Sequence, residues 1–365
     1  MIYLDSASSE QLHPAALEAL EATRSLTADV RRSHHAAKQA RLVYDNARES
    51  LAQTLGVRPD EIQFTSSGTQ AVHRGVLGLH RAAATQAAIA LSAVEHSSVR
   101  HAAAFSSAQC IELPPDNHGE VLPETMPSLG DCALVAVQSA NHEVGTVQPI
   151  AELANAMPGV PFFVDACASM GRMPLPQGWS AAAGSAHKWG GPPGVGVLLV
   201  RKGVRWRNPF PGDDRAVFPE VGFENVSACF AAAAALRAVA DEAAEVSARQ
   251  FEITRFLRER LAAIADSAVV GHPTQRLSHL VTASFLYVDG ETLVTELDRA
   301  GYAVASGSAC AASTLEPSAV LAAMGALTHG NVRISLTRET TMEQALGLAD
   351  VLDDLVPALR ARVGM

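Results

Sequence analysis

The chain has 365 residues, of which 48% are apolar and 18% are charged, so it can bury a large core and is not disordered as a whole. Its formal net charge is −10 and the acidic residues are scattered, which argues against a nucleic-acid partner bound through its phosphates. The five cysteines are odd in number and form no C-x-x-C pair, so neither a disulfide framework nor a cysteine zinc site is indicated.

The first half of the chain predicts helices that alternate with strands. Residues 14–55 have helical spacing of their apolar positions, and the segment ends at Gly56, a residue typical of a helix C-terminus. Short apolar runs bounded by turn residues follow at 62–64, 88–91, 133–137, 162–164 and 196–200. This alternation predicts an α/β fold with a mostly parallel central sheet and helices on both faces. Ligands of such sheets bind at the carboxyl ends of the strands.

The second half of the chain changes character after one long helix. Residues 226–264 have a nearly unbroken helical pattern, long enough to bridge two domains. After it come a strand at 281–288, a helix at 291–300, a strand at 332–336 and a closing helix at 342–362. These elements predict a smaller α+β domain.

Both ends of the chain are expected to lie in that smaller domain. We predict a large domain of residues 14–241 and a small domain formed by residues 1–13 and 242–365. The first five residues have neither the basic nor the apolar region of a signal peptide, and no apolar run is long enough to cross a membrane. We therefore predict a cytoplasmic protein without a membrane partner.

The segment most informative about chemistry is Ser185-Ala186-His187-Lys188-Trp189, which glycines and prolines follow. Lys188 alone would be interpreted as a solvated surface lysine. Asp165, however, ends a predicted buried strand, where its carboxylate would reach a ligand at the edge of the sheet. A lysine that forms a Schiff base and an acid that protonates a ring nitrogen are what pyridoxal 5'-phosphate requires. The pair therefore favours an enzyme that uses this cofactor.

Eight segments, including those of Asp165 and Lys188, support this interpretation by their joint order along the chain. They are Tyr3-Leu4-Asp5, Phe64-Thr65-Ser66-Ser67-Gly68-Thr69, Glu95-His96, Asn141-His142-Glu143-Val144-Gly145, Val164-Asp165-Ala166, Ser185-Ala186-His187-Lys188, Ser306-Gly307-Ser308-Ala309-Cys310 and Val332-Arg333-Ile334-Ser335. Together they resemble the cysteine desulfurases of the NifS/IscS type, in the class V aminotransferase family of fold-type I pyridoxal phosphate enzymes. The resemblance spans nearly the whole chain. It implies a large cofactor-binding domain and a small domain that carries Cys310 and Arg333.

The resemblance implies roles for residues that would surround the cofactor. Lys188 would form the Schiff base, Asp165 would pair with the pyridine nitrogen, and His96 would stack on the ring and assist proton transfer. Gly68 and Thr69 follow a predicted strand and open a helix, so their amides and the Thr69 hydroxyl can hold a phosphate. The alternative at Gly68 and Thr69 is an ordinary strand-to-helix turn with a cap.

Four further residues match the family's pattern. Ser185 and His187 correspond to its other phosphate contacts, although a lone histidine such as His187 is more often a packed residue. Arg333 corresponds to the arginine that binds the substrate carboxylate with a bidentate fork, and its alternative is a surface salt bridge. Cys310, in a run of small residues, corresponds to the cysteine that accepts sulfur, which requires an accessible thiolate. The other cysteines, Cys110, Cys132, Cys167 and Cys229, are interpreted as buried packing residues.

The chain departs from the family's pattern at four positions. His142 replaces an asparagine that contacts the cofactor, and Ala168 replaces a glutamine that donates to its phenolic oxygen. Phe223 replaces a threonine that reaches the phosphate across the dimer interface, and Glu220 replaces an arginine. We expect His142 to take over the bond that Ala168 cannot make. Loss of the partner's hydroxyl removes a charge-assisted hydrogen bond, typically worth roughly 1.5–3 kcal/mol.

The leading hypothesis from the sequence is a pyridoxal phosphate-dependent cysteine desulfurase. It would convert L-cysteine to L-alanine, carry the sulfur on Cys310 as a persulfide and pass it to a sulfur-acceptor protein, and the family implies a homodimer. The first alternative is a diverged class V enzyme, a lyase, transaminase or epimerase, that acts on another amino acid. The second is a catalytically silent family member that serves as a partner protein.

Other enzyme classes lack their sequence signatures in this chain. Neither G-x-G-x-x-G nor G-x-x-x-x-G-K-[ST] is present, which disfavours a nicotinamide enzyme and a nucleotide-binding ATPase. His142-Glu143 is not followed by the second histidine of H-E-x-x-H, so the sequence predicts no catalytic metal.

Overall fold

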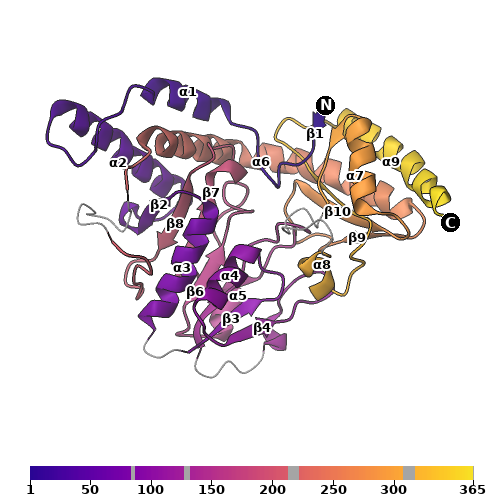
Figure 1. Cartoon of the computed structure of the whole chain (residues 1–365), viewed down its shortest axis with the longest axis horizontal. Coiled ribbons are helices and arrows are strands. Elements are labelled where there is room, and N and C mark those ends of the chain that lie inside the picture. The colour runs from indigo at the N-terminus through magenta and orange to yellow at the C-terminus, as the bar shows by residue number, and fades with distance from the viewer. Residues whose placement is uncertain (84–86, 127–131, 213–221, 307–316, 365) are drawn as a thin grey trace.

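The computed structural model describes residues 1–83, 87–126, 132–212, 222–306 and 317–364. Its centre is a seven-stranded sheet (Figure 1). The strands, in their order across the sheet, are β2 (Ile62–Thr65), β8 (Gly196–Val200), β7 (Ala181–Ser185), β6 (Phe162–Asp165), β5 (Cys132–Ala136), β3 (Ala88–Ser92) and β4 (Cys110–Leu113). Only β8 runs antiparallel to its neighbours in this sheet. The prediction of a mostly parallel central sheet is confirmed.

Helices cover both faces of this sheet, which explains why its central strands are apolar along their whole length. Phe162 and Val164 pack into one core with α1 (Pro14–Thr23), α2 (His35–Leu55), α5 (Ile150–Ala156) and the first half of α6 (Val226–Ala263). Phe163, which points to the opposite face, packs into a second core with α3 (Gly68–Ala82) and α4 (Ser97–Phe105). A Cβ at Gly75 of α3 would lie only 2.2 Å from the Phe163 ring, so glycine lets this helix approach the sheet.

The first predicted helix is two helices, so the expectation of one helical segment over residues 14–55 is wrong. The chain leaves helical geometry after α1 and re-enters it at His34, which caps α2 by accepting from the Ala37 amide. The connection is rich in short polar side chains, and Asp29 accepts a hydrogen bond from the Arg31 amide at 3.0 Å. Such local bonds compete with helix formation. Gly56 ends α2 in the left-handed conformation, as the sequence predicts.

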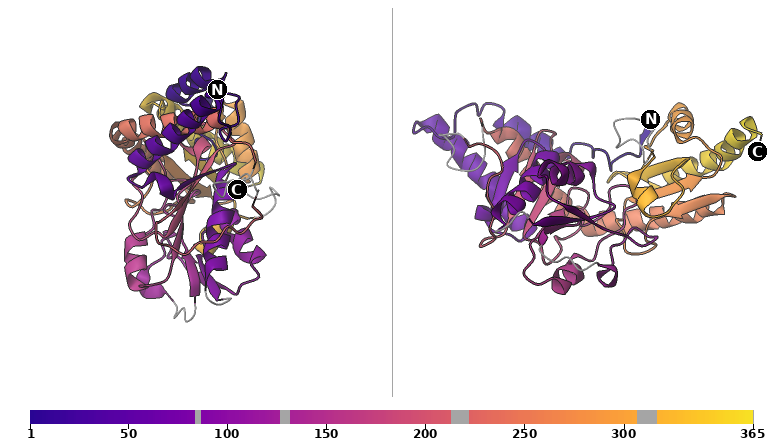
Figure 2. Two further views of the ribbon diagram at one scale, coloured as in Figure 1. Left: turned by 90° about the vertical axis from the view of Figure 1, so that its left-hand side faces the viewer. Right: turned by 60° about the horizontal axis from the view of Figure 1, so that its bottom comes forward.

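The remaining elements form a smaller unit at the other end of the molecule. A three-stranded antiparallel sheet contains β9 (Ser267–Val270), β10 (Leu280–Phe285) and β12 (Asn331–Ser335), and β1 (Ile2–Tyr3) pairs in parallel with β11 (Tyr302–Ala303). The helices are α7 (Gly290–Arg299), α8 (Ala319–Ala323) and α9 (Met342–Arg362), and short 3-10 turns occur at η1 (Pro59–Glu61), η2 (Pro123–Thr125) and η3 (Ala186–Lys188). Both chain ends lie here (Figure 2).

Helix α6 joins the two units. Its buried residues from Val226 to Leu236 belong to the large core, and those from Gln250 to Leu261 lie on the small unit, with no buried residue between them. Leu4, near the start of the chain, is fully buried in the small core. The domain division between residues 241 and 242 falls within the unburied middle of α6 and stays a prediction. No helix in the described part of the chain is both long and apolar enough to cross a membrane.

Candidate active site

A cavity lies at the carboxyl ends of β6 and β7. It is lined by every site residue that the sequence nominates within the described ranges, namely Gly68, Thr69, His96, His142, Asp165, Ser185, His187, Lys188 and Arg333. The ends of parallel strands are where the backbone of an α/β fold diverges, and side chains from several segments meet there. The structure therefore brings together nominated residues that are as far as 265 positions apart, since Arg333 and Gly68 line the same space.

Asp165 is the last residue of β6 and is 6% exposed. Its Oδ1 accepts a hydrogen bond from the Cys167 amide at 2.9 Å, which fixes the carboxylate at the end of the strand. The Cys167 side chain also lines the cavity. Burial, and then the neighbouring Asp165 carboxylate, raise the pKa of this thiol well above its usual range, so it stays protonated at neutral pH.

One end of the cavity has the donors that an anion requires. Gly68 and Thr69 begin α3, and Ser67 caps this helix by accepting from the Gln70 amide at 3.1 Å. A Cβ on Gly68 would lie 2.6 Å from the Cβ of Ser185, so glycine is needed where α3 meets the end of β7. Helix amide groups and the Ser185 hydroxyl therefore lie together, in the arrangement that favours phosphate.

His187 and Lys188 lie in η3, directly after β7. Burial, and then the Lys188 charge, lower the pKa of His187 to about 4, so its ring is neutral at pH 7. The Lys188 Nζ points to the N-terminal segment and donates to the Ala7 carbonyl. The Glu10 amide in turn donates to the His187 carbonyl at 2.8 Å. The N-terminal segment therefore lies against Lys188 and His187, and its Ser8 lines the cavity, which no motif in the sequence indicated.

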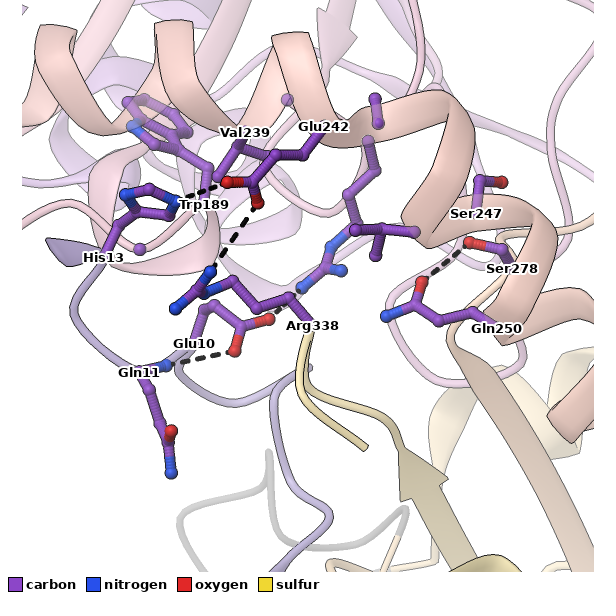
Figure 3. A pocket seen from close by; sticks show the side chains of 15 residues that line it. Glu10, Gln11, His13, Trp189, Val239, Glu242, Ser247, Gln250, Ser278 and Arg338 are labelled. Atoms are coloured by element: carbon purple, nitrogen blue, oxygen red, sulfur yellow. Dashed lines mark hydrogen bonds and ion pairs between the residues drawn. The ribbon is translucent and has the colours of Figure 1, made fainter. Parts of the chain in front are cut away.

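Behind the Lys188 segment lies a second cleft, between the N-terminal segment, the middle of α6 and Arg338 (Figure 3). His13 Nε2 lies 3.4 Å from Glu242 Oε1, and Arg338 Nη1 lies 3.6 Å from Glu242 Oε2. Glu10 pairs with Arg172 at 2.9 Å. These contacts connect the N-terminal segment and Arg338 to the unburied part of α6.

His96 and His142 form an imidazole pair on the cavity wall. Their ring centroids are 5.0 Å apart, and the planes meet at 77°. His96 caps α4, and its Nδ1 accepts from the Ser98 amide at 3.1 Å, which assigns the ring proton of the neutral form to Nε2. Burial, and then His142, lower the pKa of His96 to about 4. The ring is therefore neutral at pH 7 and able to stack on a flat ligand.

Glu95, next to His96, is a buried acid that the sequence showed only as part of a motif. Its Oε1 accepts from the Gln138 amide at 2.5 Å, and its Oε2 has no hydrogen-bond partner among the described residues. Burial, and then the Asp165 charge, raise the pKa of Glu95 to about 8. Glu95 is thus neutral at pH 7.

Arg333, in the middle of β12, is 1% exposed. Its Nη2 donates to Asp5 Oδ1 at 2.9 Å and to Ser8 Oγ at 2.6 Å. Its Nη1 donates to the His142 carbonyl at 3.1 Å. The guanidinium therefore links the small unit, the N-terminal segment and the His142 turn at the cavity wall, rather than forming a surface salt bridge.

Two predicted residues, Cys310 and Glu220, lie outside the described residues. Three of the departures from the family's pattern lie within the described residues. Ala168 lines the cavity, and Phe223 is 64% exposed. The third is His142. His142 Nε2 lies 3.6 Å from Glu143 Oε1. A bond from His142 to the cofactor stays a prediction.

The interpretation of four cysteines as buried packing residues needs correction. Cys229 is buried in the large core and Cys132 packs against it at partial exposure. Cys110 is exposed because it begins β4, an edge strand whose outer side meets solvent. Cys167 lines the cavity, because it directly follows the strand end that carries Asp165. That position after the strand was the available sequence signal for Cys167.

Known proteins match the chain along its whole length. Residues 2–348 match the model of the aminotransferase class-V family. The chain is 32% identical to the cysteine desulfurase IscS of Dictyoglomus turgidum, over 98% of this chain and 95% of that protein. It is 35% identical to the IscS-like cysteine desulfurase of Mycobacterium tuberculosis, over 99% and 97%. A solved NifS-like protein matches with a TM-score of 0.89 and 25% identity, over 98% of this chain and 99% of that one, which confirms the predicted fold. With this fold and this cavity, the chain belongs to the aminotransferase class-V family, as a relative of its IscS and NifS-like cysteine desulfurases.

Proposed function

We propose that the protein is a pyridoxal phosphate-dependent cysteine desulfurase that converts L-cysteine to L-alanine. The observation that carries the proposal is that Lys188, Asp165 and Arg333 line one cavity. A basic side chain, a buried acid and a carboxylate-binding guanidinium are the groups that amino-acid chemistry on this cofactor requires. The desulfurase relatives point to cysteine as the amino acid.

The residues present fit the cofactor. The start of α3, with Ser185 packed against Gly68, supplies donors for the phosphate, and Asp165 supplies an acceptor for the ring N–H. When bound, the cofactor supplies a carbonyl carbon that Lys188 and the substrate amine can bond in turn, and a ring that withdraws electrons from the substrate Cα. His96, neutral at pH 7, can stack on this ring.

The chain's own residues divide the remaining work. Arg333 binds the substrate carboxylate, and Lys188 moves the proton at Cα. The Cys310 thiolate then attacks the substrate sulfur: an S–S bond forms, the substrate C–S bond breaks, and its electron pair remains on carbon, which takes up a proton. The products are L-alanine and a persulfide on Cys310. The persulfide sulfur passes to an acceptor protein in the cytoplasm.

Two copies of the chain are part of this proposal. Phe210 and Phe223 are 38% and 64% exposed, and they line a common cleft beside β2 and the start of α3. Exposed aromatic residues that line one cleft favour a protein interface. We therefore propose a homodimer that covers them. Sedimentation of the purified protein tests this, and Phe223→Asp should shift the population towards monomer.

The activity is tested by incubating the purified protein, loaded with pyridoxal phosphate, with L-cysteine and measuring L-alanine. We expect alanine formation by the wild type and loss of the enzyme persulfide in Cys310→Ala. Cys110→Ala is the matched control, because Cys110 is exposed and far from β6 in the sheet order. Absence of turnover in loaded protein, or full persulfide formation in Cys310→Ala, contradicts the proposal.

A second candidate function follows from Ala168, which lines the cavity where the family has a donor glutamine. A cavity without that donor favours a diverged class V enzyme that performs lyase, transaminase or epimerase chemistry on another amino acid. In this case Cys310→Ala retains full activity towards the true substrate. The same pair of variants therefore separates the two candidates.

A further inference from the structure

The guanidinium of Arg333 is already engaged by a carboxylate of its own chain. Asp5 Oδ1 and Ser8 Oγ take hydrogen bonds from Nη2 at 2.9 and 2.6 Å, which uses both protons of that nitrogen. Nε is buried and has no hydrogen-bond partner among the described residues. A carboxylate binds a guanidinium bidentately along the Nε–Nη2 or the Nη1–Nη2 edge. Both edges include Nη2, so neither is open to a ligand while Asp5 and Ser8 hold it.

The N-terminal segment keeps Asp5 in this place. Ser8 donates its hydroxyl proton to Asp5 Oδ1 at 2.8 Å while it accepts from Arg333, so the three side chains form one closed set. The Tyr3 hydroxyl shares its one proton between the backbone carbonyls of Asp5 and Ser9, at 3.0 and 2.8 Å, which fixes the turn between them. Asp5 is therefore held against the arginine by its own turn.

The physical reason for the Asp5 contact is the burial of Arg333. A cation that is 1% exposed is costly to the fold unless an anion compensates it. A ligand carboxylate offers the same compensation as Asp5 and cannot take the same Nη2 protons at the same time. Two carboxylates near one guanidinium also repel each other. Ligand binding is thus an exchange of one carboxylate for another.

We propose that Asp5 is a positioning residue that competes with the carboxylate of the bound amino acid for Arg333, and so weakens ligand binding at this site. The inference rests on the proposed role of Arg333 as the carboxylate-binding residue. Asp5 pairs with the buried Arg333 guanidinium between turnovers and releases its Nη2 when a ligand binds. The contact therefore limits affinity for every ligand that binds through its carboxylate.

Asp5→Asn is the informative variant, because the amide oxygen can still accept from Nη2 while the negative charge is gone. We expect the KM for L-cysteine to fall by about three- to tenfold, with a much smaller change in kcat. Simple damage to the fold would move KM in the opposite direction. Ser9→Ala is the matched control, since Ser9 is exposed in the same turn and should leave both constants unchanged.

A binding measurement without turnover gives a second readout. The probe is 3-mercaptopropionate, which has the carboxylate and thiol of cysteine but no amine, and its Kd is measured by isothermal titration calorimetry. We expect Asp5→Asn to lower this Kd by about three- to tenfold and Arg333→Gln to abolish binding. If Asp5→Asn does not fold, Ser8→Ala is measured in its place. Ser8→Ala frees one of the two Nη2 protons of Arg333, so it must lower the Kd of the probe as well.

The outcomes separate this inference from the proposed function. A lower probe Kd in Asp5→Asn supports the inference even if wild-type protein makes no alanine from cysteine, in which case the desulfurase proposal fails alone. An unchanged or higher Kd in folded Asp5→Asn, with binding still lost in Arg333→Gln, overturns the inference and leaves the desulfurase proposal intact. Retained binding in Arg333→Gln overturns the role of Arg333 on which the inference rests.

Discussion

On one side of the cavity, Asp165 and Ser185 end strands that are buried on both faces, and Lys188 follows within three residues of Ser185. On the other side, Arg333 is held by Asp5 and Ser8, which are 328 and 325 positions away in the chain. The sheet side is positioned by packing, and the arginine side by hydrogen bonds between ionic and polar groups. Changes on the sheet side should therefore affect the fold and the cofactor, whereas changes on the arginine side should affect ligand affinity.

The largest effect is expected on the sheet side, at Lys188. Under the proposed function, Lys188→Ala removes the group that would bond the cofactor and move the Cα proton, so turnover of L-cysteine should fall by about 10²- to 10⁴-fold or more. Alanine formation under saturating cysteine measures it. Lys202→Ala, an exposed lysine after β8, serves as the control. Comparable turnover in the two variants would remove Lys188 from the mechanism.

The next effect concerns Glu95, and it depends on pH. Its folded pKa of about 8 lies above the ordinary value of 4.5, so the folded state retains a proton that the unfolded state loses, and the free energy of unfolding falls as pH rises between these values. Glu95→Gln is neutral throughout and should lose this slope, so that it gains a few kcal/mol relative to wild type by pH 8. Urea unfolding at pH 5, 6.5 and 8 measures the slope.

Glu124→Gln, at an exposed position, should follow the wild-type pH dependence of the free energy of unfolding. A wild-type slope that persists in Glu95→Gln would place the responsible proton on another group.

Gly68→Ala sharpens the comparison by a steric change on the sheet side. Its Cβ would lie 2.6 Å from Ser185 Cβ and 3.0 Å from Cys167 Sγ, so α3 or β7 must shift. We expect a loss of about 1–3 kcal/mol in the free energy of unfolding and weaker binding of pyridoxal phosphate. Denaturant unfolding and cofactor titration measure the two effects. Gly212→Ala, where a Cβ meets nothing within 4 Å, should change neither.

The smallest effect is expected in the second cleft, behind Lys188, where Glu242 lies. Glu242 pairs with His13 and Arg338, but its side chain is 41% exposed and water screens the pairs. Glu242→Gln should therefore lower the free energy of unfolding by no more than about 1 kcal/mol. Glu245→Gln, 89% exposed on the same helix, is the control. A loss of several kcal/mol in the free energy of unfolding of Glu242→Gln would show that ion pairs stabilise this cleft.

The same contrast explains how far the sequence was informative. Apolar runs and the long α6 pattern predicted the central sheet and the bridging helix, since burial on two faces leaves a continuous apolar signal. Asp165 was predictable because it ends such a strand, whereas Lys188 was recognised through its motif, since the strand before it, β7, is not among the predicted apolar runs. The break between α1 and α2 was not, because it depends on local polar bonds such as that from the Arg31 amide to Asp29.

Contacts between distant segments could not be predicted from the sequence either. No sequence pattern pairs Asp5 with Arg333, which are brought together by the parallel pairing of β1 with β11 and by the bridges from Asp5 to Ser335 and from Ala305 to Arg333. Glu95 and Cys167 were visible as residues, but their roles depend on burial beside Asp165. The main groups of the cavity could therefore be predicted from the sequence. The residues that modify their charge and contacts became visible only in the structure.

The most direct test of the central claim is the visible absorbance spectrum of the protein loaded with pyridoxal phosphate, recorded before and after addition of L-cysteine, with alanine measured in the same sample. We predict a cofactor absorbance band that changes on addition of cysteine, accompanied by alanine in amounts that exceed the enzyme. A spectrum that cysteine leaves unchanged, with no alanine formed, would contradict the assignment of this cavity as a cysteine desulfurase site.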